Sequence, residues 1–235
     1  EFVGFKWFTE LITNQGHRDN IIRVMKNTFG MSGLGLATSW MPMAFAIFLN
    51  EIGNARFKKF VQIFTTLPNF ISWALVFSFA MALFAMDTGI FSKFMLGIGA
   101  IDQPVAWLNS GEHIWLKMWG WGTWKGLGWG AIMYLAAISG IDQELYEAAV
   151  IDGASKFQQA IYITLPGLKT MLVLMFITAV GGIFNSDFGL FYQATRGANY
   201  PLYPVVANFD IKIYQMITGA GVGLGKTSAT SFLYT

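Results

Sequence analysis

The feature that most constrains this chain is the length of its uncharged segments. Residues 27–50 contain no Asp, Glu, Lys or Arg, and neither do residues 60–86. As a helix, each is long enough to cross about 30 Å of hydrocarbon. Only 12% of all residues are charged, about half the share of a typical soluble domain. Because a bilayer offers no water to backbone groups, such segments cross it as helices. We therefore expect an all-α, polytopic membrane protein.

Three further segments have the composition of membrane spans. Residues 114–140 contain no charges other than Lys117 and Lys125. Residues 170–184 are short for a span of about 20 residues, so we expect this helix to start within the preceding segment. A last span is expected to start near Ser228 and to be cut off by the end of the sequence.

The orientation of the chain follows from its short loops. Residues 51–59 hold Arg56, Lys58 and Lys59, and clustered basic residues in a short loop mark the cytoplasmic side. Alternation then places residues 141–169 in the cytoplasm. Residues 87–112 and 185–227 fall on the outer side.

Several classes of function lack the residues they require. There are no cysteines, which excludes disulfides and thiolate metal sites. The two histidines, His17 and His113, are far apart in sequence, so we expect no metal site. The net charge of +2 and scattered basic residues do not favour nucleic acid.

Residues near both ends of the sequence lack the context that a signal peptide or a nucleotide site requires. Residues 1–8 lack the basic start and apolar core of a signal peptide, and we expect the natural protein to extend beyond both ends. Residues 220–227 fit a loose phosphate-binding loop, but such a loop follows a strand and opens a helix in an α/β domain. No such domain is expected here, so we interpret these glycines as a turn.

Residues 141–167 are polar and helix-prone between two apolar segments. Asp142 is a plausible N-cap of a first helix, and Gly153 is expected to break it and to let a second helix turn away. Phe157, Ala160 and Ile161 give the second helix an apolar stripe, and Pro166 should end it. Asp152 either caps this second helix or faces a partner. A short amphipathic projection of this kind suits docking into a groove of another protein.

This segment resembles a known motif. Glu147-Ala148-Ala149, followed by Gly153, Ile163 and Leu165-Pro166, is similar to the EAA loop of ABC importer permeases, the binding-protein-dependent inner-membrane components. Residues 67–73 and 184–188 look like the carbohydrate and polysaccharide-uptake branch. The resemblance implies a type I permease domain over residues 1–235, with about five to six transmembrane helices and a cytoplasmic coupling loop at residues 141–167. It also implies that the first span and most of the last lie outside this sequence.

The resemblance further implies partners and a location. The coupling residues Glu147, Ala148, Ala149, Asp152, Gly153, Leu165 and Pro166 would contact a dimer of cytoplasmic ATPase subunits, which bind ATP and Mg. A second permease subunit and an extracytoplasmic solute-binding protein would complete the complex in the bacterial cytoplasmic membrane. The chain itself would need no cofactor and would catalyse no reaction.

Five residues are candidates for lining the substrate path: Trp121, Trp124, Lys125, Asn185 and Asp187. Indole rings stack on the apolar faces of sugars, while polar groups bind hydroxyls. Each has an alternative interpretation: the tryptophans as plain packing, and Lys125 as a side chain that reaches the membrane interface rather than a cavity. Trp115 and Trp119 fit an interfacial belt better, and Lys117 is expected to reach the interface.

Two other functions stay open from the residues. The same type of importer could carry a non-sugar solute, although the spans lack the arginines of a phosphate path and the acids of an amine path. A stand-alone secondary transporter would be expected to carry coupling acids in its spans. It would also leave the coupling-loop sequence without a purpose.

Overall fold

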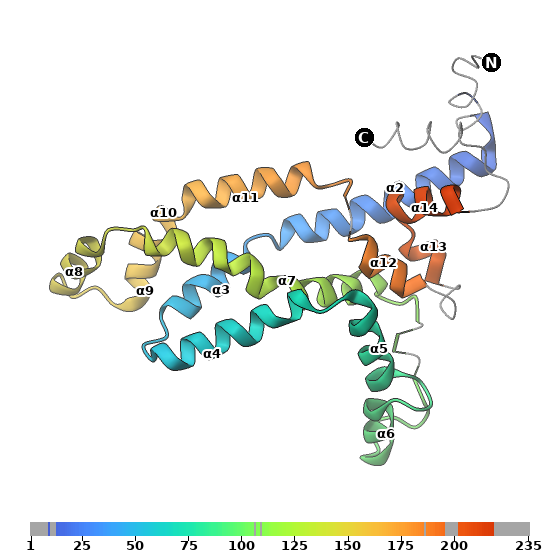
Figure 1. Cartoon of the computed structure of the whole chain (residues 1–235), viewed down its shortest axis with the longest axis horizontal. Helices are drawn as coiled ribbons and strands as arrows, with labels where there is room; N and C mark the ends of the chain where they lie inside the picture. The colour runs from blue at the N-terminus through green and yellow to red at the C-terminus, as the bar shows by residue number, and fades with distance from the viewer. Residues whose placement is uncertain are drawn as a thin grey trace. The chain divides into compact units, whose positions relative to one another are not determined.

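The computed structural model describes residues 9, 13–105, 107–108, 110–185, 187–195 and 202–218. Within these ranges the chain forms helices and no strands (Figure 1), which confirms the all-α prediction. The predicted turn at residues 220–227, the last span and residues 1–8 lie outside the described residues.

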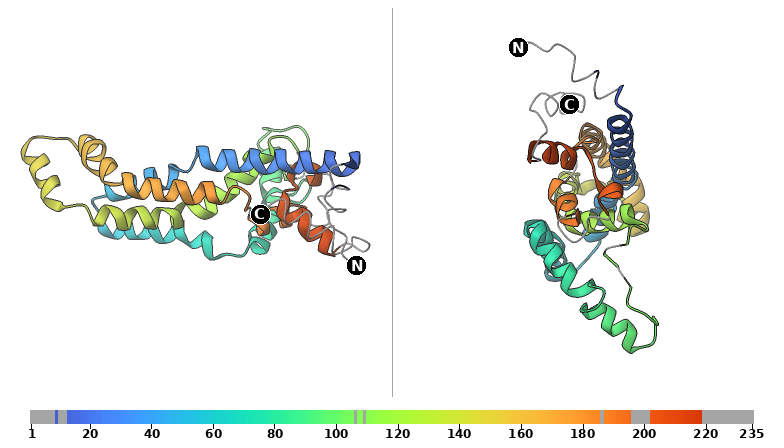
Figure 2. Two further views of the ribbon diagram at one scale, coloured as in Figure 1. Left: turned by 90° about the horizontal axis from the view of Figure 1, so that it is seen from above. Right: turned by 90° about the vertical axis from the view of Figure 1, so that its right-hand side faces the viewer.

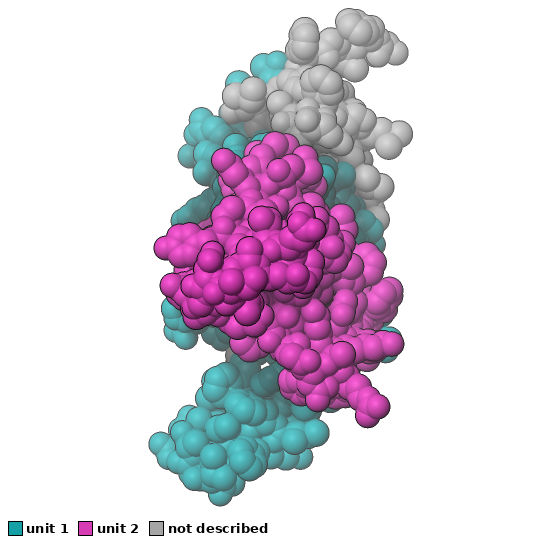
Figure 3. Space-filling model, turned by 90° about the vertical axis from the view of Figure 1, so that its left-hand side faces the viewer, with its two compact units in different colours: residues 1–33, 72–118, 182–235 teal, residues 34–71, 119–181 magenta. Residues whose placement is uncertain are grey.

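The chain divides into two compact units, shown in different colours in Figure 3. Unit 1 comprises residues 1–33, 72–118 and 182–235, and unit 2 comprises residues 34–71 and 119–181. Two long helices, α2 (Gln15–Ala37) and α7 (Ile114–Ser139), contribute residues to both. The assignment of residues 1–235 to a single permease domain stays a prediction.

Unit 2 is built on α3 (Met41–Asn50), α4 (Ala55–Thr66) with the 3₁₀ turn η1 (Leu67–Phe70), most of α7, and α11 (Lys169–Gly181). Its core joins α3 to α7, and its fully buried members include Ala46, Ala131 and Leu168. Tyr134 and Ile138 complete the α7 side of this core. The segment between α7 and α11 forms the predicted coupling loop.

Unit 1 contains the first part of α2 and the helices α5 (Trp73–Phe84), α6 (Ile90–Gly97), α12 (Phe188–Thr195), α13 (Tyr203–Val206) and α14 (Phe209–Thr218). Helix α5 packs against α6 and α12, and α12 packs against α13 and α14. Stacked and edge-on rings of Phe188, Tyr192 and Tyr214 hold α12 to α14.

Two predicted spans agree closely with helices. The predicted span at residues 114–140 is α7, and the span at 170–184 is α11, whose helical stretch does begin within the preceding segment. The span at residues 27–50 is helical too, but its helix starts at Gln15, well before the first uncharged residue.

The predicted span at residues 60–86 is wrong as a single helix. It is interrupted between η1 and α5, where Ile71 and Ser72 have extended backbone. Pro68 lacks an amide donor, and the Ser72 hydroxyl accepts the amide of Leu75 to start a new helix. Helices α6 and α12 to α14 were also missed, since they lie in segments predicted to be outer loops.

By length and apolarity, the described residues contain one helical stretch able to cross a membrane, residues 15–50. There are up to three if each of two interrupted pairs, residues 55–84 and 156–181, counts as one span. Helix α7 is not among them, because its tryptophans, glycines and two lysines lower its mean hydropathy. Large apolar side chains such as Phe48, Phe64 and Phe70 are about two thirds exposed, as expected of surfaces that face lipid or another subunit.

Gly128 of α7 lies directly against the backbone at the end of α4. A Cβ atom there would overlap the backbone of Thr65 and Thr66, whereas one at Gly126 would meet open space. Small residues allow such close approach of membrane helices. We predict that Gly128→Ala destabilises the protein by about 1–3 kcal/mol, measured as a lower midpoint of thermal unfolding in detergent. Gly126→Ala is the matched control, and equal midpoints for the two variants would contradict the contact.

Candidate functional site

The predicted coupling loop is a helical hairpin at one end of unit 2 (Figure 2). It consists of α8 (Gln143–Ile151), α9 (Lys156–Gln159), the π-helix η2 (Ala160–Thr164) and α10 (Leu165–Gly167). The Asp142 carboxylate accepts the amide of Glu144 at 3.0 Å, which confirms Asp142 as the N-cap. Glu144 lies in the first turn, where the helix dipole favours negative charge.

The turn of the hairpin depends on Gly153. Its φ of 78° lies in the left-handed region that residues with a Cβ rarely adopt. The amide of Gly153 donates to Val150 O at 3.1 Å, and that of Ala154 donates to Ala149 O at 2.8 Å. These two bonds form a Schellman motif that satisfies the last carbonyls of α8, and they confirm Gly153 as the breaking residue.

The cap of the second helix is Ser155, and the suggestion that Asp152 caps it is wrong. Ser155 and Gln158 form a reciprocal capping box, with the Ser155 amide donating to Gln158 Oε1 at 2.7 Å. Asp152 is instead the C-cap residue of α8 and is exposed. The Gly153 turn separates it from α9 by too many residues for a cap.

Pro166 does not end the second helix, contrary to the prediction. The helical path passes from α9 through η2 into α10, where Pro166 occupies the first turn. Pro166 has no amide to donate to the preceding turn, and the wider π turn before it makes room for the ring. The break comes at Leu168, where α10 and α11 meet at a 59° bend.

The two arms of the hairpin are fastened to each other at their base. The hydroxyls of Tyr146 and Thr164 lie 2.8 Å apart in a hydrogen bond. Gln159 is 3% exposed, and its amide donates to Ala154 O at 3.1 Å. A Cβ at Gly167 would lie 2.7 Å from the side chain of Ile141, so the two ends of the loop are in close contact.

The solvent-exposed surface of the hairpin is largely apolar. Ile151, Phe157 and Tyr162 are 86%, 73% and 75% exposed. Glu147 and Ala148 are exposed as well, and Glu147 has no hydrogen bond or ion pair within the described part of the chain. A fixed hairpin that leaves this much apolar surface uncovered is typical of an interaction site.

Three path candidates lie on α7 in unit 2. The rings of Trp121 and Trp124 meet edge to face, with centroids 5.9 Å apart. The Lys125 ammonium donates to the carbonyl oxygen of Asn69 at 2.8 Å. Lys125 therefore binds the end of η1, where the helix is interrupted. The Lys117 ammonium instead donates to the carbonyl oxygen of Ser110, just before α7.

The other two candidates, Asn185 and Asp187, lie in unit 1 and are both exposed. The Asp187 carboxylate accepts the Trp73 indole N–H at 2.6 Å through one oxygen and the Leu190 amide at 3.3 Å through the other. Gly189 lies against the same indole, where a Cβ would meet the ring. Asp187 thus starts α12 and holds it to α5.

Sequence reasoning missed Tyr146, Ser155, Gln159, Thr164 and Trp73. The pair Ser155 and Gln158 has the spacing of a capping box and could have been found. The contact of Trp73 with Asp187 joins residues 114 positions apart, and no local pattern indicates it. The two interfacial-belt candidates also have specific partners, because Trp119 donates to Thr38 Oγ1 and Trp115 to Val205 O.

Comparisons with known proteins agree with the motif. The family model described as "Binding-protein-dependent transport system inner membrane component" matches residues 25–234. YteP of Bacillus subtilis (strain 168), named a polygalacturonan/rhamnogalacturonan transport system permease protein, is 33% identical over 229 residues, covering 97% of this chain and 67% of YteP. The chain spans between 45% and 68% of the length of the other curated relatives compared.

Two solved structures have the same fold. One is a bacterial ABC transporter involved in the import of the acidic polysaccharide alginate, with a TM-score of 0.87 and 28% identity, covering 99% of this chain and 79% of that one. The other is a bacterial alginate ABC transporter in complex with alginate pentasaccharide-bound periplasmic protein, with a TM-score of 0.85 and 29% identity over 98% and 77% of the two chains. The resemblance drawn from the EAA residues is confirmed, and the chain belongs to the family of binding-protein-dependent transport system inner-membrane components.

Proposed function

We propose that this chain is a transmembrane permease subunit of an ATP-driven ABC importer that takes up a sugar or oligosaccharide. The observation that carries the proposal is the hairpin at residues 141–167, which is fixed internally and exposes apolar residues around Glu147. Membership of the family supports it, as do relatives whose names refer to transport of sugar polymers. The chain would pass the cytoplasmic membrane several times.

The hairpin would act as the coupling element. It docks against a dimer of ATPase subunits, which hold ATP and Mg, and it moves when these subunits close. The contact between Tyr146 and Thr164 and the approach of Ile141 to Gly167 keep the hairpin from deforming on its own. The displacement therefore passes into α7 and α11, which lead into the bilayer. This chain makes and breaks no covalent bond.

A second permease chain would line the other half of the path, and a solute-binding protein would deliver the substrate from outside. The similar alginate transporter was solved with such a periplasmic protein. Within this chain, Trp121 and Trp124 offer aromatic surface for sugar rings. Asn185 is exposed in a loop, while Lys125 and Asp187 would contribute to the path while keeping their structural partners.

The first experiment for this function is ATP hydrolysis by the full complex in lipid nanodiscs, with its binding protein and a panel of neutral and acidic oligosaccharides. We predict stimulation by at least one oligosaccharide, because substrate delivery favours closure of the ATPase pair. Stimulation by peptides or ions alone would keep the coupling hairpin and overturn the sugar assignment.

Glu147 provides a test of the hairpin itself. We predict that Glu147→Ala lowers ATP-driven uptake into vesicles by about tenfold or more, since a lost charge-assisted contact at a docking surface commonly costs this much. Glu144→Ala is the matched control, because that carboxylate lies in the first turn of the same helix. Normal uptake by Glu147→Ala would contradict the docking role.

Gly153 tests whether the shape of the turn matters. No atom lies within 4 Å of a Cβ built there, so a side chain has room and only the backbone conformation is strained. Gly153→Val should uncouple hydrolysis from uptake, because a left-handed β-branched residue costs about 1–2 kcal/mol or more. Gly153→Asn should retain most activity, since asparagine tolerates this conformation. Equal activities of the two variants would count against the turn.

A further inference from the structure

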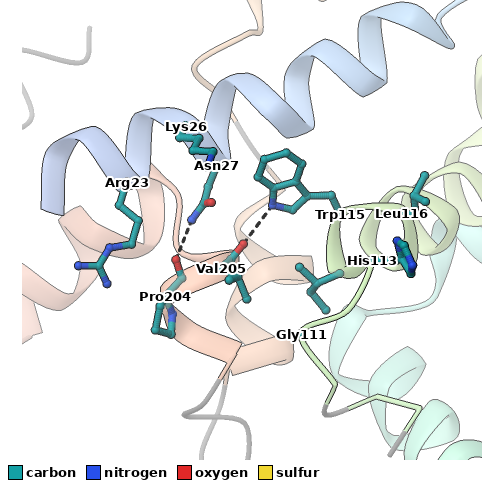
Figure 4. A pocket seen from close by; sticks show the side chains of 10 residues that line it. Arg23, Lys26, Asn27, Gly111, His113, Trp115, Leu116, Pro204 and Val205 are labelled. Carbon is teal, nitrogen blue, oxygen red and sulfur yellow. Dashed lines mark hydrogen bonds between the residues drawn. The ribbon is translucent and has the colours of Figure 1, made fainter. Parts of the chain in front are cut away.

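A pocket separate from the coupling hairpin and from the path candidates lies within unit 1 (Figure 4). Its volume is about 610 Å³, within the range of small-molecule sites. Three segments line it: Arg23, Lys26 and Asn27 of α2; Gly111 and residues 113–116 at the start of α7; and Pro204 and Val205 of α13. The orientation predicted from the short loops puts residues 87–112 and 185–227, and with them Gly111, Pro204 and Val205, at the outer side of the membrane. By the same alternation, the start of the predicted span at residues 27–50 falls on that side.

The walls of the pocket are fastened by hydrogen bonds. The buried Asn27 amide donates to Pro204 O at 3.1 Å and to Ala207 O at 3.0 Å. The Trp115 indole donates to Val205 O at 3.1 Å and packs so closely on Gly30 that a Cβ there would touch the ring. Because these bonds tie α2 and α7 to α13, the pocket is formed before any ligand arrives.

The charge of the pocket is positive. Arg23, Lys26 and His113 line it, and no Asp or Glu is among its lining residues. Arg23 and Lys26 form no ion pair within the described part of the chain, although Asp19 lies one turn from Arg23 on α2. Burial, and secondly the nearby Arg23 guanidinium, lower the pKa of Lys212.

The backbone at the pocket is also unusual. His113 has a φ of 50°, a left-handed conformation that few residues with a Cβ adopt, although histidine, like asparagine and aspartate, is found in it more often than most. It directly precedes the first residue of α7 and turns the chain into the pocket wall. Strained residues of this kind persist where the surrounding structure holds them, and they cluster at ligand sites.

We propose that this pocket binds a carboxylate-bearing unit of an acidic oligosaccharide at the outer side of the importer. The two basic side chains of α2 provide the charge for a carboxylate, and Trp115, Leu116 and Val205 provide apolar surface for the faces of the sugar rings. The proposal rests on the proposed function and deepens it, because it names the substrate as a uronate-containing oligosaccharide.

The test measures binding of trigalacturonate and of its uncharged methyl ester to the full complex in nanodiscs without the binding protein. We expect trigalacturonate to bind, the ester to bind at least about tenfold more weakly, and the double variant Arg23→Gln with Lys26→Gln to lose about tenfold in affinity for the acid. Added salt should weaken binding of the acid and leave the ester unchanged. Lys93→Gln, which removes an exposed charge of α6 in the same unit, should bind as the wild type does.

In the binding measurement, the proposal is overturned by no binding of the acid, by equal binding of acid and ester, or by an unchanged affinity of the double variant. An anionic lipid headgroup is the other anion that the pocket would attract, so the measurement is repeated in nanodiscs with and without phosphatidylglycerol. If the double variant differs from the wild type only when this lipid is present, the pocket holds a lipid headgroup and the sugar assignment falls. Uptake of neutral oligosaccharides alone by the complete system would leave the proposed function standing while removing this inference.

Discussion

The structure depends on satisfying backbone groups wherever a helix is interrupted in apolar surroundings. A continuous helix satisfies its own amides and carbonyls, but each break leaves several without partners, and lipid supplies none. Polar side chains from other helices fill this role. Lys125 donates to the carbonyl of Asn69, Ser32 donates to Ile183 O at 2.6 Å, and Asn27 serves two carbonyls around α13. These three polar residues are therefore explained by the helix breaks whose carbonyls they bind.

This constraint changes how the path candidates are interpreted. Lys125 and Asp187 are polar residues that sequence reasoning assigned to substrate, yet both have structural partners that a substrate would have to share. Trp121 and Trp124 contact each other and present indole surface to their surroundings, which suits sugar rings without competing for hydrogen bonds. In contrast, Glu147 and the basic residues of the unit 1 pocket carry exposed charges that no ion pair neutralises within the described residues. A charged side chain without a partner in its own chain is a stronger sign of a binding partner than a charged side chain that is already hydrogen-bonded.

How far the sequence predicts this structure depends on the range of the interactions involved. A long apolar segment with Lys117 and Lys125 as its charged residues predicted α7 to within a residue at each end, and local chemistry identified Asp142 as a cap and Gly153 as a turn. The prediction failed where one local signal was overridden by context, as at Pro166, which a π turn accommodates. It failed too where charge-poor loops hide short helices such as α6. Contacts like that of Trp73 with Asp187 cannot be found from one sequence, because nothing local specifies which distant residue becomes the partner.

Leu168, at the bend between α10 and α11, explains how a movement of the hairpin is passed to the helices of unit 2. Leu168 is fully buried and packs in the core formed by α3 and α7, beside Tyr134 and Ile138. It lies at the 59° bend between the hairpin and α11. A flexible linker at this point would absorb any displacement of the hairpin. A buried side chain cannot move without its neighbours, because packed cores shift as units rather than deform continuously. Because the bend is packed in the core, the hairpin and the helices of unit 2 move together.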